Sequence, residues 1–190
     1  MNLEVMKAPS ITYKFEAFRG RVVRPARSIH IAGLRVMHRP AVIVPDEPKW
    51  QDVIRNLVTT AGKNDMLDKY FAGSAYTAAW YVGLIDNTSW SAVAAGDTMA
   101  SHSGWVESTA YTEGTREVVA FSAASAASKA ASGPTEFTIN ATVTIRGAFL
   151  ASNSTKGGTT GILYSAAAFS GTRALVLNDL LRVTPTYSLT

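Results

Sequence analysis

Apolar and polar residues alternate along much of the chain after residue 78, which is the pattern of strands with one buried face. The clearest case is the segment 135–151, TEFTINATVTIRGAFLA. Its alternating apolar positions are Phe137, Ile139, Ala141, Val143 and Ile145. Gly147 interrupts the alternation and predicts a bulge or a corner, so we expect a strand pair or one bent strand here.

Shorter apolar segments separated by turn residues continue this pattern. The other strands that we expect are 78–85, 116–122, 162–169, 173–177 and 180–189. Ser170-Gly171 and Asn178-Asp179 predict turns, and Pro185 predicts that the last strand lies at an edge or is broken there. The alanine-rich segment 122–133 is expected to be a loop or a strand extension. Six to eight short strands favour an antiparallel β-sandwich of the jelly-roll kind over a parallel sheet.

The period of the apolar residues is different between residues 48 and 72, where we expect one or two short helices. The first has apolar residues three and four positions apart, with Pro48 at its start and Gly62 at its end. Its apolar residues are Trp50, Val53, Ile54, Leu57 and Val58. The second begins at Asn64 and ends at Gly73. Its apolar residues are Met66, Leu67, Tyr70 and Phe71.

The first 47 residues differ from the rest in charge. Residues 1–45 contain eight Lys and Arg against two Glu, whereas residues 46–190 contain ten Lys and Arg against twelve Asp and Glu. Prolines exclude a long helix from this segment. We therefore divide the chain into a basic extended arm, residues 1–47, and a β-sandwich domain, residues 48–190. Within the arm, residues 11–18 and 29–36 read as strands.

The arm is the candidate partner-binding element. Its candidate contact residues are Lys14, Arg19, Arg21, Arg24, Arg27, Arg35 and Arg39. They can dock on an acidic protein surface, neutralise phosphates of a nucleic acid, or stay solvated. Few aromatic residues are available to stack on bases, so a protein partner is favoured over nucleic acid. On this interpretation, deleting residues 1–45 leaves a folded body and abolishes attachment.

Composition limits the other possibilities. Charged residues make up 17% of the chain, against roughly 25% in typical proteins, and this suits close packing against other copies or neighbours. The chain has no cysteine, and we see no secretory signal or membrane-spanning segment. His30, His38 and His102 lack metal-ligand spacing, and no nucleotide-binding motif occurs. We expect no enzyme activity, no cofactor and no metal.

Two small groups of side chains are further candidates. Glu113 and Glu117 flank Arg116 and predict an ion-pair patch on the surface. Trp90, Trp105 and Tyr111 are candidate interface aromatics, because the two tryptophans lie in irregular chain. The same three residues could form a platform for carbohydrate, although anchoring of a loop or contact with a protein is the commoner use of such tryptophans.

Several segments, in order, resemble a pattern in virion proteins of tailed bacteriophages. They are KNDMLDKYFAG (63–73), WYVGLIDN (80–87), GDTMASHSGWVESTAYTEGTREVVAFSAA (96–124), FTINATVTIRGAFLAS (137–152), GGTTGILYSAAAF (157–169) and RALVLNDLLRVTPTYSL (173–189). The chain departs from that pattern at Asn178, where glycine is usual, at Ile145, where an aromatic residue is frequent, and at Pro185.

The resemblance implies a β-sandwich of the kind found in capsid decoration (cement) proteins and in tail-fibre or collar proteins, without catalytic residues. The expected function is therefore a capsid decoration protein that binds and stabilises the shell, with a tail, collar, head-fibre or baseplate component as the alternative. Its expected partners are the major capsid protein or other virion proteins, and it is expected to form a dimer or trimer. Its place is the virion, after synthesis in the host cytoplasm.

Overall fold

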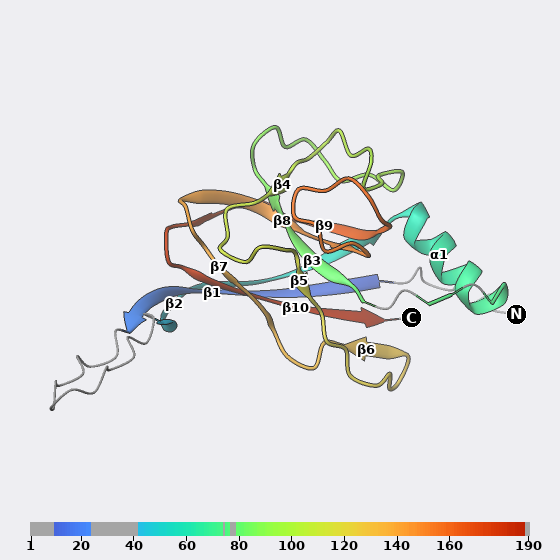
Figure 1. Ribbon diagram of the computed structural model, residues 1–190, viewed down its shortest axis with the longest axis horizontal. Helices are drawn as coiled ribbons and strands as arrows, with labels where there is room; N and C mark the ends of the chain where they lie inside the picture. The colour runs from blue at the N-terminus through green and yellow to red at the C-terminus, as the bar shows by residue number, and fades with distance from the viewer. Residues whose placement is uncertain (1–9, 24–41, 74, 77–78, 189–190) are drawn as a thin grey trace, which may run out of the picture.

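The protein is mainly β, and the residues that the structure describes form one antiparallel sheet of ten strands and one short helix (Figure 1). The structure, a computed structural model, describes residues 10–23, 42–73, 75–76 and 79–188. The elements are β1 (Ser10–Val23), β2 (Val42–Val58), α1 (Thr60–Phe71), β3 (Tyr81–Asp86), β4 (Glu107–Ser108), β5 (Glu117–Val118), β6 (Ser128–Ala130), β7 (Thr135–Thr138), β8 (Val143–Ala151), β9 (Leu163–Leu175) and β10 (Leu180–Ser188). The main strand order is β4-β3-β8-β9-β2-β1-β10-β6; β5 pairs with β3, and β7 with β10.

Strand β1 lies inside the sheet, between β2 and β10. It confirms the strand expected at residues 11–18, because every second side chain is buried. These inward side chains are Ile11, Tyr13, Phe15 and Ala17. Residues 10–18 are thus part of the body rather than of a separate arm, and the boundary drawn between residues 47 and 48 falls within β2. The strand expected at residues 29–36 lies outside the described residues.

The helix expected from residue 48 is wrong, because β2 continues as a strand to Val58. Both periods fit this segment: alternate residues such as Ile54 and Val58 are buried, and Val53 and Leu57 point outward. Pairing with β1 decides between them. One helix follows, and it begins after Thr59, whose hydroxyl accepts a hydrogen bond from the Gly62 amide, rather than at Asn64.

Gly62 does not end a helix. It lies in the first turn of α1 with its backbone against β9, and a Cβ at this position would come within 2.4 Å of the Tyr164 carbonyl oxygen. The expected end at Gly73 agrees with the structure: the last helical residue is Phe71, and Gly73 adopts a φ of +67°.

Two regions of the sheet share one apolar core. Side chains of β1 and β10, such as Phe15 and Val183, form a single cluster with side chains of β3, β8 and β9, such as Leu84, Leu150 and Phe169. The rings of Phe15 and Phe169 meet edge to face at 4.7 Å. A second cluster lies beneath the loop between β3 and β4. It includes Ile85, Met99, Trp105, Phe149 and Leu163.

The segment 135–151 forms β7 and β8, and the pairing of β8 with β9 shifts register at Gly147, as expected for a bulge. The turn expected at Ser170-Gly171 is wrong. Strand β9 continues through it, and its four residues 169–172 lie opposite the single residue Arg146 of β8. Residues between Phe121 and Ala131 form a hairpin with its tip at 125–128.

The last strand is neither broken nor at an edge, so the expectation from Pro185 is also wrong. β10 pairs with β1 along its whole length, and its other side pairs with β7 up to Val183 and with β6 from Thr186. Pro185 falls in the gap between those two ladders. A missing amide donor is tolerated on that side, because neither β6 nor β7 forms a ladder pair with Pro185.

Truncation of Phe15 tests the place of β1 in the core. We expect Phe15→Ala to lower the free energy of unfolding by about 3–5 kcal/mol, because a large buried ring leaves a cavity. Lys14→Ala, its exposed neighbour, should lower it by less than about 1 kcal/mol. Urea unfolding measures both. Deletion of residues 1–45 should abolish folding, contrary to the expectation from sequence. Equal losses of unfolding free energy in Phe15→Ala and Lys14→Ala would contradict the place of β1 in the core.

Four of the seven tyrosines should resist ionisation while the protein is folded. Burial raises the pKa of Tyr13, Tyr111, Tyr164 and Tyr187 above the ordinary value of about 10. A tyrosine whose pKa is raised by folding stabilises the fold at every pH below the pKa that it has in the unfolded chain. That contribution is lost progressively as the pH rises above about 10. We expect tyrosinate absorbance of these four to appear only together with loss of the circular dichroism of the sheet. Ionisation that precedes this loss would contradict the burial.

Candidate interaction surfaces

Beyond Phe18, β1 and β2 continue as a two-stranded ribbon. β10 pairs with β1 only as far as Phe18, whereas β1 and β2 stay paired up to Val23 and Val42. The ribbon ends in the exposed valines Val22, Val23 and Val42. It lies toward one end of the long axis of the molecule, and α1 lies toward the other (Figure 1).

The base of the ribbon is held against the turn before β10. A Cβ at Gly20 would lie 1.8 Å from the carbonyl oxygen of Asn178, so only glycine permits this contact. Two register shifts between β1 and β2 come just before this point, between Ala17 and Phe18 and between Phe18 and Gly20. Lys49 of β2 forms an ion pair with the buried Asp179, whose carboxylate also accepts the Val176 amide. These contacts set the direction in which the ribbon leaves the sheet.

The turn before β10 has an asparagine in a conformation that favours glycine. Asn178 has a φ of +71°, in the left-handed region that glycine adopts without strain and asparagine tolerates better than most residues. The turn predicted at Asn178-Asp179 is confirmed.

The basic residues described on β1 are paired with carboxylates. Lys14 contacts Glu16 at 3.0 Å, Arg19 contacts Glu47 at 3.6 Å, and Arg21 contacts Asp46 at 3.8 Å. Two of these acids come from the strand that faces them in the antiparallel register. The excess positive charge predicted for the arm is thus partly neutralised at the ribbon. The other candidate residues lie outside the described part of the chain: Arg24, Arg27, Arg35 and Arg39.

The three candidate interface aromatics do not form one exposed surface. Trp105 is 1% exposed; its indole N–H donates to Asp97 at 2.9 Å, and His102 stacks on its ring at 3.9 Å. Tyr111 is fully buried. Trp90 is half-buried beneath the Arg146 guanidinium. Trp105 and Tyr111 therefore cannot serve as contacts for a protein partner or a sugar, and they anchor the loops that contain them.

Arg116 is buried, so the surface patch predicted around it is wrong. Its guanidinium donates to both carboxylate oxygens of Glu107, at 2.9 and 2.7 Å, and not to Glu113 or Glu117. It also donates to the carbonyls of Asn153 and Gly158, which fixes the loop between β8 and β9. The spacing of Glu107 and Arg116 in the sequence could not predict this pair. The two residues come together because β4 and β5 both pair with β3.

Lys156 joins the loop between β8 and β9 to the segment between β4 and β5. Its ammonium lies 4.2 Å from the centroid of the Tyr111 ring and donates to the backbone carbonyls of Tyr111 and Glu113. The Glu113 carboxylate accepts the amide of Thr138 in β7. The titratable groups in this region thus serve to connect loops with strands.

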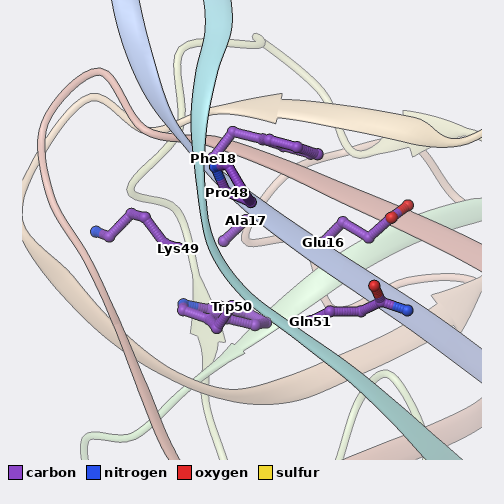
Figure 2. A pocket seen from close by; sticks show the side chains of 7 residues that line it. All are labelled: Glu16, Ala17, Phe18, Pro48, Lys49, Trp50 and Gln51. Carbon is purple, nitrogen blue, oxygen red and sulfur yellow. The ribbon is translucent and has the colours of Figure 1, made fainter.

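A hollow of about 180 Å³ lies where β1 and β2 shift register. Its walls include Phe18, Pro48 and Trp50. Figure 2 shows Glu16 and Lys49 on its rim, pointing to opposite sides. Lys49 is paired with Asp179 and Glu16 with Lys14, so the two charged groups at the rim are already neutralised. Both charged side chains that line the hollow therefore already have partners.

Within the described ranges, no three His, Cys, Asp or Glu side chains gather in a way that could hold a metal ion. No helix in that part of the chain is long and apolar enough to span a bilayer. In comparisons with known proteins, no family model matches the chain, and no curated protein matches it.

Removal of Arg116 tests the buried pair. We expect Arg116→Leu to lower the free energy of unfolding by about 3–5 kcal/mol, because the Glu107 carboxylate would remain buried without its partner. Arg182→Ala, which removes the exposed pair with Glu136, should cost no more than about 1 kcal/mol. Urea unfolding compares the two, and hydrogen exchange should show faster exchange in residues 152–161 of the first variant. Similar losses in both variants would refute a structural role for the buried pair.

Proposed function

We propose that this chain is a structural protein of a tailed-bacteriophage virion, and specifically a capsid decoration protein that binds the major capsid protein and stabilises the shell. The observation that carries the proposal is the ribbon of β1 and β2, which extends beyond the sheet and ends in exposed valines. Apolar side chains on a projecting ribbon favour contact with another protein surface. The resemblance to phage virion proteins in residues 63–189 supports the same assignment.

The use of charge also supports a binding role rather than catalysis. Among the described residues, the buried charged side chains include Asp97, Arg116 and Asp179, and the side chain of Glu107, which pairs with Arg116, is only 7% exposed. Asp97 holds the loop around Trp105, Arg116 holds the loop after β8, and Asp179 holds the turn beneath the ribbon. Each therefore has a structural task that accounts for its burial. We propose that the protein is not an enzyme and needs no cofactor.

The segment between the two ribbon strands supplies the remaining positive charge. It contains Arg24, Arg27, Arg35 and Arg39 and no acidic residue, and it begins and ends at the ribbon tip. An acidic surface on a capsid subunit is the partner chemistry that fits this segment. The ribbon can place it there, while the rest of the molecule covers neighbouring shell surface.

We propose further that the two regions of the sheet pack face to face as a jelly-roll-like sandwich. The apolar cluster shared by β1 and β10 with β3, β8 and β9 supports this arrangement. The hydrogen bond between the hydroxyls of Tyr13 in β1 and Ser165 in β9 supports it as well, because it joins two strands that are not neighbours in the sheet order.

A loop replacement tests the attachment role without disturbing the core. Val23 and Val42 are directly opposed, so residues 24–41 can be replaced by Asn-Gly, which forms a two-residue hairpin turn. We expect this variant to fold normally and to lose binding to particles that lack the native protein. Sedimentation of the purified variant with such particles measures binding. Binding at full occupancy would refute the role of the ribbon segment.

The double substitution Val106→Ser with Val118→Ser is the matched control, because it changes two exposed apolar residues outside the ribbon and outside the turn that contacts its base. It should bind as the native protein does.

Quantitative mass spectrometry of native particles then separates the two virion locations. Copies in the hundreds support the shell, a handful supports a tail or collar component, and absence from purified particles refutes both.

A further inference from the structure

The outer face of α1 carries large apolar side chains, where a surface helix normally carries polar ones. Tyr70 and Phe71 are 77% and 78% exposed, and Leu67 is about half exposed. They are three and four residues apart and form one stripe along the helix. The opposite side of α1 faces the sheet, where Gly62 meets the backbone of Tyr164. The stripe therefore points away from the body.

The stripe is ordered for contact. The rings of Tyr70 and Phe71 meet edge to face, with centroids 4.9 Å apart. Tyr76, just beyond the helix, is 81% exposed. Rigid aromatic side chains lose little conformational entropy on binding, which is why they are enriched at protein interfaces. We call Leu67, Tyr70, Phe71 and Tyr76 the aromatic stripe.

We propose that the aromatic stripe is a self-association surface: α1 of one copy packs antiparallel against α1 of a second copy, across a two-fold axis near Leu67. Such an interface is self-complementary, because each copy contributes the same patch. Three exposed aromatic rings and one leucine offer roughly 500 Å² for burial on each copy. The two copies together bury about 1,000 Å², which reaches the lower limit of specific interfaces.

Charge around the stripe agrees with the antiparallel arrangement. A two-fold axis at Leu67 places Lys63 of one copy opposite Phe71 of the other, because each lies four residues from the axis. Lys63 is on the same side of the helix as the stripe, since 63, 67 and 70 follow the helical repeat. Its ammonium would meet an aromatic ring and the negative end of the partner helix, and both contacts are favourable.

This inference goes beyond the proposed function and is tested without phage particles. We expect sedimentation equilibrium of the full chain to show a monomer–dimer equilibrium. Tyr70→Ser combined with Phe71→Ser should raise the dimer dissociation constant roughly 100-fold, because two central aromatic contacts are lost from each copy. The control is Val176→Ser with Leu177→Ser, two exposed apolar residues in the turn before β10, which should leave the constant unchanged. Circular dichroism checks that both variants are folded.

Cross-linking gives a second readout that does not depend on the aromatic substitutions. The chain has no cysteine, so Leu67→Cys places a single thiol at the proposed axis. A short bis-maleimide should join two copies of this variant and leave Leu177→Cys monomeric.

Three results would overturn the proposal. The first is a wild-type chain that stays monomeric and a Leu67→Cys variant that does not cross-link. The second is a dimer that persists unchanged in the Tyr70→Ser, Phe71→Ser variant, which would place the interface elsewhere. The third is a dimer that forms only after residues 1–9 are deleted, which would mean that the chain's own N-terminal segment covers the stripe. None of these results bears on binding to a capsid.

Discussion

The whole fold depends on the pairing of β1 with β2 on one side and with β10 on the other. This strand joins segments that lie more than a hundred residues apart in the chain, and its inward side chains fill the centre of the core. Closing such long loops costs entropy that only the completed sheet can offset. Without β1, both β10 and most of β2 would lose a neighbour, and the aromatic cluster around Phe169 would face water.

The same pairing creates the candidate attachment element. Because β1 and β2 extend beyond Leu180, the first residue of β10, two strands leave the sheet together and carry the segment 24–41 between them. The close contact of Gly20 with Asn178 and the ion pair of Lys49 with Asp179 connect the ribbon to the turn before β10. A core strand and the projecting ribbon are thus parts of one continuous strand.

Local patterns predicted many elements correctly, and the errors share one cause. The strand at residues 11–18, the bulge at Gly147, the turn at Asn178-Asp179 and the helix end at Gly73 follow from alternation or from turn chemistry within a few residues. By contrast, Trp50 to Val58 fits both a helical and a strand period, and Ser170-Gly171 resembles a turn although β9 continues through it. Pro185 resembles an edge residue until its position between two partner strands is known. In each case the outcome depended on a neighbour distant in sequence.

For the candidate site residues too, some properties follow from the local sequence and others depend on contacts with distant segments. Exposure of the ribbon valines, burial of Trp105 and Tyr111, and the pairing of Arg116 with Glu107 depend on which loops and strands meet. The stripe of Leu67, Tyr70 and Phe71 is visible in the sequence as a helical repeat. Its outward direction is not, because an apolar stripe ordinarily faces the core. Here Gly62, with no side chain, allows the other side of the helix to approach β9 closely.

By itself, the sequence determined the mainly β class, the strand at the N-terminus, several turns and the separation of basic from acidic residues. These features follow from side-chain periodicity and backbone preference, which act over a few residues. Only the tertiary structure decided that β1 belongs to the core, that β2 is a strand throughout, and which carboxylate faces each basic side chain. Those outcomes depend on register between distant strands, and register is set by the joint burial of both partners.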